Sequence, residues 1–231
     1  MKTQSIRLRG GVARVAAWHG RSDVANLALQ CRGAPAIDEI ELLIEELRTA
    51  GYRAVLTNAL APGASLPFVD CGFEVRGRLH LLAFDFAAHS LSSSTRRTRR
   101  AAAVDRPALL AVDAAAFDDF WTLDDVGLEQ AAQATPRSHS RVERADPIGG
   151  YGLFGRAERV GYVQRLAVHP RAQGAGLGLA LLRDGLRWMR LRGARSAYVN
   201  TQDDNERALH LYERAGFRRL PVGLCVLGRD L

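Results

Sequence analysis

The most restrictive feature of this 231-residue chain is an apolar strand that runs through a short glycine-rich loop directly into a helix. The strand pattern covers Val160–Val168, and the loop after it contains Gly174, Gly176 and Gly178. Apolar residues then recur at helical spacing over Leu177–Leu191. Glycine lets the backbone wrap closely around an anion, and the first amides of a helix have no acceptor within the helix. This order of elements therefore predicts a binding site for a phosphate-containing molecule.

Three kinds of phosphate-binding loop have to be compared with this segment, because a glycine-rich loop alone is weak evidence. A P-loop requires Lys and then Ser or Thr after its last glycine, whereas Leu179 and Ala180 follow Gly178 here. A dinucleotide-binding loop requires a third glycine where Leu179 stands. The third kind fits. Residues 171–176 read Arg-Ala-Gln-Gly-Ala-Gly after a strand that ends in Leu-Ala-Val-His-Pro, and this segment resembles the acetyl-CoA pyrophosphate loop of the GNAT acetyltransferases.

A second segment resembles the same family. Residues 205–217 read Asn-Glu-Arg-Ala-Leu-His-Leu-Tyr-Glu-Arg-Ala-Gly-Phe and match the family pattern Asn-x-x-Ala-x-x-Leu-Tyr-x-x-x-Gly-Phe at every fixed position. The resemblance is tight over residues 160–217 and extends in outline over residues 109–231. It implies an α/β fold of the GNAT type with a mixed sheet, and N-acetyltransferase activity with acetyl-CoA as the cosubstrate.

The resemblance assigns roles to individual residues. In the family, the strand backbone at Leu166, Ala167 and Val168 pairs with the pantetheine amides of CoA, as an added strand pairs with a sheet edge. Asn205 contacts the cosubstrate near its reactive end, and Tyr212 protonates the departing CoA thiolate. The pyrophosphate is held by the loop and the start of the helix, at Arg171, Gln173, Gly174, Ala175, Gly176, Leu177 and Gly178.

The implied reaction is direct attack of an amine on the thioester carbonyl, through a tetrahedral intermediate whose oxyanion a strand N–H stabilises. An alkylammonium with a pKa of about 10 must first lose a proton, so a base is required. Some family members place a Glu five positions before the motif Asn, where this chain has Asn200. Others place an acid on the strand before the loop, where this chain has Gln164 and Arg165. The base is unassigned, with a water chain or an acid from residues 118–129 as hypotheses, and His169 beside the loop as the one histidine to test.

The charge distribution also favours an anionic ligand in the last third of the chain. The net charge is +7, residues 1–150 hold 18 basic and 18 acidic residues, and residues 151–231 hold 14 arginines and 7 acids. Clustered positive charge raises the local concentration of an anion such as CoA, which carries a pyrophosphate and a 3′-phosphate. The arginines of residues 96–100 have no interleaved aromatic residues, which argues against nucleic acid as the partner.

Composition bounds the remaining classes of function. No run of about 18 apolar residues could span a bilayer, and Lys2 and Arg7 precede any signal-peptide core, so we expect a cytoplasmic protein that does not bind membranes. Cys31, Cys71 and Cys225 lie far apart without metal-ligand spacing, which predicts reduced thiols and no metal site. The sequence leaves the oligomeric state open, a homo-oligomer included.

The predicted domains are a first unit at 1–90, a linker at 91–107 and the GNAT acetyltransferase domain at 108–231. The linker is inferred from the polar and then basic stretch at residues 90–100. Within the last domain the patterns predict strands at 108–112, 140–144, 148–154, 160–168 and 196–201, helical turns at 117–134, helices at 177–191 and 205–215, and a final strand or hairpin at 218–231. The acceptor cleft is expected to border residues 117–134, and the sequence leaves open whether the first unit also contributes to it.

The first unit resembles a truncated, degenerate copy of the GNAT domain. An offset of 144 residues superimposes Gly72-Phe73 on Gly216-Phe217, with further matches of Ala64 to Ala208, Thr57 to Thr201 and Val55 to Val199. The chemistry is absent from this copy, because Phe68 replaces Tyr212, Ala61 replaces Asn205, and residues 30–34 replace the glycine loop. We therefore expect a structural role for it.

Two rival functions follow from features that acetyl transfer leaves unexplained. The missing Glu and the inert first copy are compatible with a module that binds acyl-CoA without catalysis. The arginine-rich composition is compatible with a protein that associates with nucleic acid or ribosomes. Tyr212 argues against the first rival, because a binding module has no use for a proton donor beside the thioester.

Overall fold

The computed structural model describes residues 4–18, 21–31, 33–91 and 98–231, and the chain divides into two compact units. Unit 1 is formed by Met1–Leu81, Thr201–Asp204 and Leu220–Leu231, and unit 2 by Leu82–Asn200 and Asn205–Arg219. This division differs from the predicted domains, since the first boundary falls after Leu81 and the C-terminal strand belongs to unit 1. No helix among the described residues is long and apolar enough to cross a membrane.

The described part of unit 1 contains a mixed sheet with the strand order β1-β2-β3-β4-β12-β5. Its strands are β1 (Gln4–Leu8), β2 (Gly11–Trp18), β3 (Arg21–Cys31), β4 (Ala54–Thr57), β12 (Leu224–Asp230) and the first part of β5 (Glu74–Asp85). Strands β1, β2 and β3 form an antiparallel meander, and β3 then pairs with β4 in parallel over Val24–Leu27. A parallel connection requires a crossover, and helix α1 (Ile37–Thr49) supplies it.

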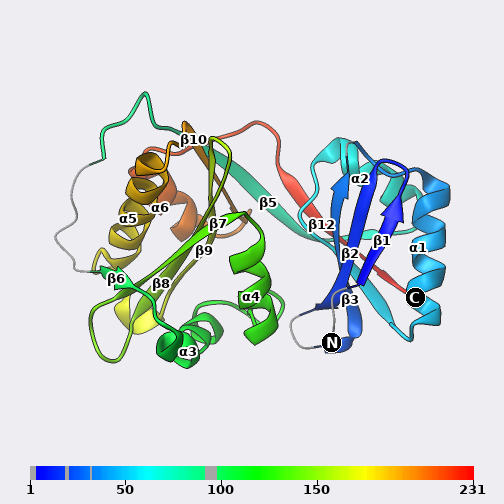
Figure 1. Cartoon of the computed structure of the whole chain (residues 1–231), viewed down its shortest axis with the longest axis horizontal. Helices are drawn as coiled ribbons and strands as arrows, with labels where there is room; N and C mark the ends of the chain where they lie inside the picture. The colour runs from blue at the N-terminus through cyan, green and yellow to red at the C-terminus, as the bar shows by residue number, and fades with distance from the viewer. Residues whose placement is uncertain (1–3, 19–20, 32, 92–97) are drawn as a thin grey trace. The chain divides into compact units, whose positions relative to one another are not determined.

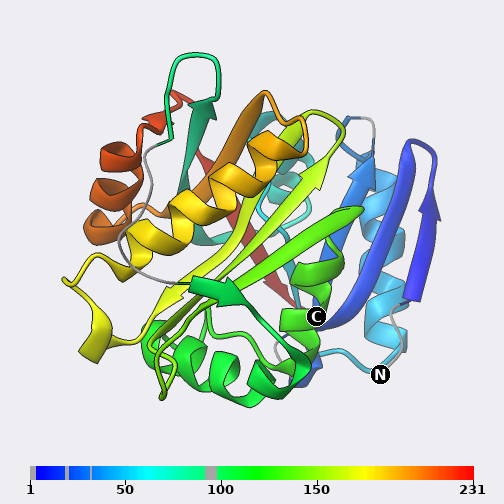
Figure 2. The ribbon, with the colours of Figure 1, turned by 60° about the vertical axis from the view of Figure 1, so that its left-hand side comes forward.

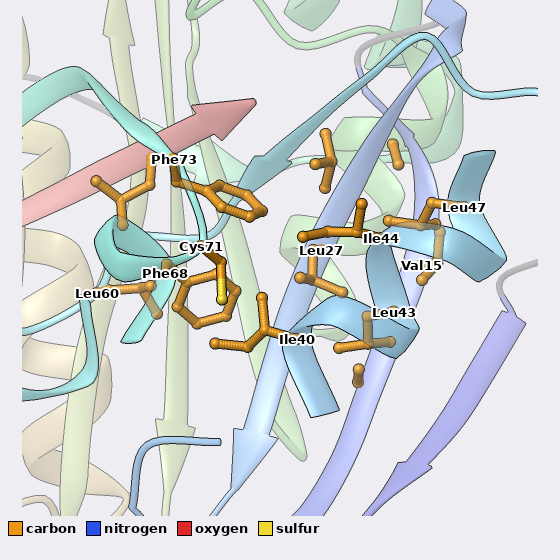
Figure 3. Packing of buried hydrophobic residues seen from close by; sticks show 14 residues of the cluster. Val15, Leu27, Ile40, Leu43, Ile44, Leu47, Leu60, Phe68, Cys71 and Phe73 are labelled. Atoms are coloured by element: carbon orange, nitrogen blue, oxygen red, sulfur yellow. The ribbon is translucent and has the colours of Figure 1, made fainter. Parts of the chain in front are cut away.

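The core of unit 1 is built by α1 and by α2 (Pro62–Asp70). The helical spacing of Ile40, Leu43, Ile44 and Leu47 gives α1 one apolar face, and each of these side chains is at most 5% exposed. Figure 3 shows this face packed against residues of the sheet and of the α2 region, including the cluster members Val15, Leu27, Phe68, Cys71 and Phe73. Full burial of each such aliphatic side chain contributes roughly 1.5–3 kcal/mol.

Unit 2 contains a second mixed sheet, in which the end of β5 is followed in strand order by β10, β9, β8, β7 and β6, with β11 paired to β5. The bounds are β6 (Thr98–Arg100), β7 (Arg137–Glu143), β8 (Gly150–Ala157), β9 (Val160–Val168), β10 (Ser196–Gln202) and β11 (Arg218–Arg219). Strands β6 to β9 are antiparallel, whereas β9 and β10 are parallel. The strands predicted at 140–144, 148–154, 160–168 and 196–201 are confirmed, with small shifts at their ends.

Helices cover both faces of the sheet in unit 2. Helices α5 (Leu177–Leu191) and α6 (Glu206–Ala215) lie on one face, and α3 (Arg106–Ala116) and α4 (Asp125–Gln133) lie on the other (Figures 1 and 2). Short 3₁₀ turns, η1 (Ala103–Asp105) and η2 (Pro170–Ala172), precede α3 and α5. Helix α5 approaches β8 closely because Gly185 lacks a side chain, and a Cβ atom there would lie 2.3 Å from the Phe154 ring.

The strand predicted at residues 108–112 is wrong, because these residues belong to α3. A short apolar run does not distinguish a buried strand from a buried helix, and the alanine-rich continuation to Ala116 favours a helix. Leu109, Val112 and Asp113 form the buried face, and Pro107 lies in the first turn, where a missing N–H costs nothing.

The linker predicted at 91–107 also differs from the structure. Residues 92–97, including Arg96 and Arg97, lie outside the described residues, but the rest of the segment forms β6, η1 and the start of α3. Two nitrogens of Arg99 bind the two oxygens of Asp105 at 2.6 and 2.7 Å, and the Asp105 side chain is 7% exposed. This pair fixes the second half of the segment, although the sequence there is as polar as a linker.

Each unit is completed by a strand from the other half of the chain. In unit 1, β12 pairs antiparallel with both β4 and β5, and Leu227 of β12 is fully buried in the core. In unit 2, residues 82–85 of β5 take a place next to β10 and pair with β11, and Leu82 and Phe84 are at most 1% exposed in its core. The sheet of unit 1 therefore combines strands from the two ends of the described chain.

Candidate active site

Strands β9 and β10 of unit 2 pair only where they begin. Their parallel register runs from Val160 with Ser196 to Tyr162 with Tyr198, and it ends there. Beyond Tyr162, β9 keeps β8 as a neighbour on one side but has no strand partner in β10 on the other. An extended ligand with amide groups can add to such an edge as a further strand.

The direction of the backbone groups of β9 decides which residues could serve such a ligand. The N–H of His169 donates to the carbonyl of Gly149 at 2.9 Å, on the side of β8. Because backbone groups alternate between the two sides of a strand, Ala167 also points toward β8, whereas Leu166 and Val168 point toward the open side. The Val168 carbonyl already accepts a hydrogen bond from Nε2 of Gln173 at 2.9 Å. Two of the three predicted strand residues are thus placed at the open edge, and Ala167 is not.

A β-bulge lies in β9 where it leaves β10. Leu153 of β8 pairs with Arg165 and Phe154 with Val163, so Gln164 is an extra residue in β9. A bulge bends its strand and increases the local twist, which is compatible with the divergence from β10. It also directs Gln164 and Arg165 to the same face, where Nε2 of Gln164 contacts Oγ1 of Thr135 at 3.2 Å and Arg165 contacts α3.

The glycine loop presents a set of amides without partners. Gly174 and Gly176 adopt φ angles of +78° and +79°, a region that favours glycine, and no atom lies within 4 Å of an added Cβ at either. The amides of residues 174–179 donate no hydrogen bond to any described residue. They lie at the N-terminal, positive end of the 15-residue helix α5, and the exposed Arg171 precedes them. This geometry fits a pyrophosphate group.

His169 has a structural role beside the loop. Its Nδ1 accepts the N–H of Arg171 at 3.2 Å and so caps the η2 turn. This hydrogen bond ties the end of β9 to the start of the loop. His169 therefore contributes to the conformation at the start of the loop.

Helix α6 carries the two remaining motif residues. Asn205 is its N-cap, and the side-chain oxygen accepts the N–H of Ala208 at 3.0 Å. Gly216, with φ +103°, ends the helix, and the following Phe217 donates its N–H to the carbonyl of Tyr212 at 3.0 Å. The motif spacing thus encodes both ends of a short helix as well as its tyrosine.

Tyr212 is 5% exposed and packs edge-on against Phe217, with ring centroids 5.6 Å apart. Its hydroxyl makes no hydrogen bond with any described residue. Burial raises the pKa of Tyr212 well above its usual range, and the positive charge of Arg165 partly opposes the rise. The phenol therefore keeps its proton at neutral pH and has that proton available for a ligand.

Most acids of residues 118–129 are occupied with structural tasks. Asp118 accepts two backbone N–H groups of the following turn, each at 3.0 Å, and Asp124 caps α4 through a bond of 2.7 Å. Asp125 and Glu129 both pair with one arginine, Arg106. These four carboxylates serve the turn, the cap and the ion pair, which weakens the hypothesis that this segment supplies the base.

A buried polar network was missed by sequence reasoning. The guanidinium of Arg165 binds Asp113 through Nε and Nη2, at 2.7 and 2.6 Å, and the Asp113 side chain is fully buried. The Tyr151 hydroxyl donates to the same carboxylate at 2.6 Å, and the N–H of Leu123 donates at 2.8 Å. The available signal was a single acid, Asp113, within the apolar and alanine-rich run 108–116.

Comparison with known proteins shows the family. Residues 107–217, which contain the diverging strands, the glycine loop and α6, match the acetyltransferase (GNAT) family. Residues 107–217 form a GNAT acetyltransferase domain. A mycothiol acetyltransferase from Amycolatopsis mediterranei is 35% identical over 133 residues, which cover 50% of this chain and 43% of that protein. A mycothiol acetyltransferase from Frankia alni is also 35% identical, over 49% of this chain and 39% of that protein. The chain spans less than half of these relatives.

Solved structures show the same fold over nearly the whole chain. A tandem GNAT protein from the clavulanic acid biosynthesis pathway superimposes with a TM-score of 0.69 at 12% identity, over 96% of this chain and 79% of that one. A GCN5-related N-acetyltransferase from Kribbella flavida also gives 0.69, at 17% identity, over 99% and 90%. The α/β GNAT fold with a mixed sheet is confirmed.

Two local features of unit 1 can be compared with those of the GNAT domain. Gly72 has φ +79°, and Phe73 donates its N–H to the carbonyl of Phe68 at 3.0 Å, as Phe217 does to Tyr212. At the corresponding end of the β3–β4 pairing, however, Oδ1 of Asn58 accepts the N–H of Leu29 at 3.2 Å. A side chain thus occupies the backbone position that the GNAT domain leaves open.

Proposed function

We propose that the GNAT domain transfers the acetyl group of acetyl-CoA to the nitrogen of an amine acceptor. One observation carries this proposal: an open strand edge, a loop of unpartnered amides and a buried tyrosine with a free hydroxyl all belong to the same unit. A binding module would need the first two features but not the third.

The GNAT domain offers groups for the pantetheine arm, the pyrophosphate and the reactive end of acetyl-CoA. Leu166 and the N–H of Val168 would pair with the pantetheine amides, because their backbone groups face the open side of β9. The amides of residues 174–179 and the guanidinium of Arg171 would bind the pyrophosphate. Asn205 would position the start of α6 beside the reactive end rather than act as a free amide, since its oxygen is used in the cap.

The chemistry required of the protein is modest. The amine nitrogen bonds to the thioester carbon, the resulting tetrahedral intermediate loses the C–S bond, and an amide and a CoA thiolate result. Tyr212 would donate its proton to that sulfur and recover one from solvent. Because the acids of residues 118–129 are largely engaged, we propose that the proton of the attacking ammonium leaves to water.

The acceptor is proposed only as a class. Proteins named mycothiol acetyltransferases match the GNAT domain over part of their length, so a mycothiol-type amine belongs in the first panel of acceptors. Small primary amines and peptides with a free N-terminus complete the panel, because acceptor specificity depends on loops that vary on a shared scaffold.

The test measures the release of CoA thiol from acetyl-CoA with each amine of the panel, together with acetyl-CoA affinity by calorimetry. Replacement Tyr212→Phe is expected to lower kcat roughly 10²- to 10⁴-fold, the usual contribution of a general acid, with the Kd of acetyl-CoA nearly unchanged. Tyr52→Phe, at a half-buried tyrosine of unit 1, is the matched control and should keep full activity. Tight acetyl-CoA binding without turnover on any acceptor would instead support a binding module, and an unchanged rate in Tyr212→Phe would refute its role as acid.

A further inference from the structure

We propose that Arg165 and Asp113 form a positioning pair that holds residues 117–123 against β9 as one wall of the acceptor site. The inference rests on the proposed acetyl transfer in the GNAT domain and extends it to the acceptor side. Neither residue is expected to touch the reacting atoms. They affect the reaction by fixing the position of residues 117–123.

The pair is saturated with hydrogen bonds from its own surroundings. The Asp113 carboxylate accepts both bonds of the Arg165 fork, the Tyr151 hydroxyl and the N–H of Leu123, which uses its whole accepting capacity. This leaves the carboxylate with no lone pair for a substrate proton. Asp113 is therefore unsuited to be the missing base. Its role is to position the groups that donate hydrogen bonds to it.

Three contacts connect the pair to residues 117–123. The Arg165 guanidinium lies 3.5 Å from the centroid of the Phe117 ring, and its Nη2 donates to the carbonyl of Trp121 at 2.8 Å. The Leu123 N–H donates to Asp113 at 2.8 Å. The beginning, middle and end of the segment are thus each attached to one buried ion pair.

Stability alone is a weak reason for such a pair. Removing two charges from water is costly, and apolar residues of similar volume are often as stable or more stable in the same place. Apolar side chains cannot make directional hydrogen bonds. Here Arg165 donates one to a backbone carbonyl of the irregular segment, and Asp113 accepts one from a backbone N–H of the same segment. The structure is therefore better explained by the position that the pair imposes on residues 117–123.

That position is the reactive end of the open strand edge. Arg165 immediately precedes Leu166, whose backbone faces the open side, whereas the glycine loop begins beyond Val168. The charge of Arg165 also reaches Tyr212. Residues 117–123 consequently lie beside the open strand edge on the face of the sheet opposite α6 (Figure 2), and in this proposal the amine approaches the thioester from that face.

The test compares two changes to the pair with a matched control. The double variant Asp113→Leu/Arg165→Met replaces both charges with apolar side chains and leaves no isolated buried charge. Arg165→Lys keeps both charges of the pair but loses the fork, and it serves as the second variant if the double variant does not fold. The control is Asp184→Leu/Arg141→Met, which removes another ion pair of unit 2, between α5 and β7, whose partners are 2.5 Å apart.

Hydrogen exchange and steady-state kinetics are measured on the full chain, with 2-phenylethylamine and the mycothiol-type amine as acceptor probes. In both pair variants the amides of residues 117–124 should exchange at least about 10-fold faster while β8 and β9 stay protected. The KM for the amine should rise roughly 10- to 100-fold, with the KM for acetyl-CoA unchanged. The control variant should show neither effect.

Faster exchange throughout unit 2, or unchanged exchange in residues 117–124, would overturn the proposal even if the enzyme remains active. An equal rise in the KM for the amine and in the KM for acetyl-CoA would also overturn the proposal, because it would indicate a general structural role of the pair. Absence of wild-type turnover with every amine would refute the proposed function instead, and selective exchange in residues 117–124 would still show that the pair holds this segment.

Discussion

At the scale of single residues, Phe68 and Tyr212 can be compared directly. Phe68 and Tyr212 occupy the same place in equivalent turns, and each accepts a backbone N–H from a phenylalanine five residues later at 3.0 Å. The rings of Phe68 and Phe73 lie 5.1 Å apart, close to the 5.6 Å between Tyr212 and Phe217. The aromatic body is therefore part of the fold, and the hydroxyl is what only the GNAT domain adds.

The glycine loop gives a prediction at this scale. Gly174→Glu places a carboxylate beside amides that we assign to the pyrophosphate, so the Kd of acetyl-CoA should rise by about 100-fold or more because like charges repel at close range. Gly193→Glu is the matched control, because Gly193 also has a left-handed φ, +85°, and nothing within 4 Å of an added Cβ, but lies at the other end of α5. Both variants should lose about 1 kcal/mol of stability to backbone strain. Calorimetric titration with acetyl-CoA checks the difference, and equal losses of affinity in both would contradict the assignment.

Residue types with an obligatory spacing were predictable, and residues defined by a tertiary partner were not. The loop glycines and the N-cap Asn205 could be placed because a left-handed turn and a helix start each favour particular residues, whereas the role of Tyr212 was predicted only from the family resemblance. The Arg165–Asp113 pair joins residues 52 positions apart, and no local pattern marks it. The backbone groups of Ala167 point toward β8 because of the way β9 pairs with β8. The spacing of residues in the sequence does not reveal this pairing.

At the scale of elements, side-chain polarity alone did not predict the ordered structure of residues 98–107, which belong to unit 2. Strand β6 is short and polar, and η1 follows it directly. The segment is ordered by the Arg99–Asp105 pair and by Thr98 and Arg141, which both bind Asp184 of α5. Local composition predicted a linker because two of the partners, Arg141 and Asp184, lie elsewhere in the chain.

The Arg99–Asp105 pair should make the stability of this element depend on pH. The Arg99 fork and the Ala102 N–H lower the pKa of Asp105 from 3.8 to about 2. Because the folded-state pKa is below the unfolded one, the stabilisation is present above pH 3.8 and is lost as the pH falls through about 2. Asp105→Asn should cost roughly 1–2 kcal/mol at pH 7, somewhat reduced by the partial exposure of Arg99, and the two proteins should converge near pH 2.

Urea denaturation of both proteins between pH 2 and pH 7 measures this difference. Asp125→Asn is a suitable control, because the Asp125 side chain is 66% exposed in its pair with Arg106 and exposed pairs contribute little. A difference between wild type and Asp105→Asn that stays constant down to pH 2 would contradict the role of the ionised carboxylate.

At the scale of the whole molecule, we propose that the two halves are copies of one unit that have exchanged strands. Both contain an antiparallel meander, a crossover helix into a parallel strand, and a second helix that ends at a left-handed glycine. The sequence offset of 144 residues indicated that the halves are related. It did not indicate the exchange, because aligned residues contain no information on which strands pair.

The exchange predicts long-range effects of single substitutions. Leu227 of β12 is fully buried in the core of unit 1 and its N–H donates to Oγ1 of Thr57 at 3.0 Å. Leu227→Ala should cost about 2–5 kcal/mol and should accelerate hydrogen exchange in α1 and β4, far away in sequence. Leu191→Ala, at a residue that is 79% exposed, is the control and should have little effect. Faster exchange limited to residues 218–231 would show that β12 is not required by the core of unit 1.

The exchanged strand also sets an order of events during synthesis on the ribosome. The residues of unit 2 are complete once Arg219 has been made, and its borrowed strand β5 has by then long been available. Unit 1 still lacks β12 at that moment, so the facing edges of β4 and β5 have no partner. Unpaired strand edges can pair with the wrong strand or with another chain. The nascent N-terminal segment must therefore avoid such pairing until β12 has been synthesised. The half of the gene that is translated first thus encodes the half of the protein that can finish folding last.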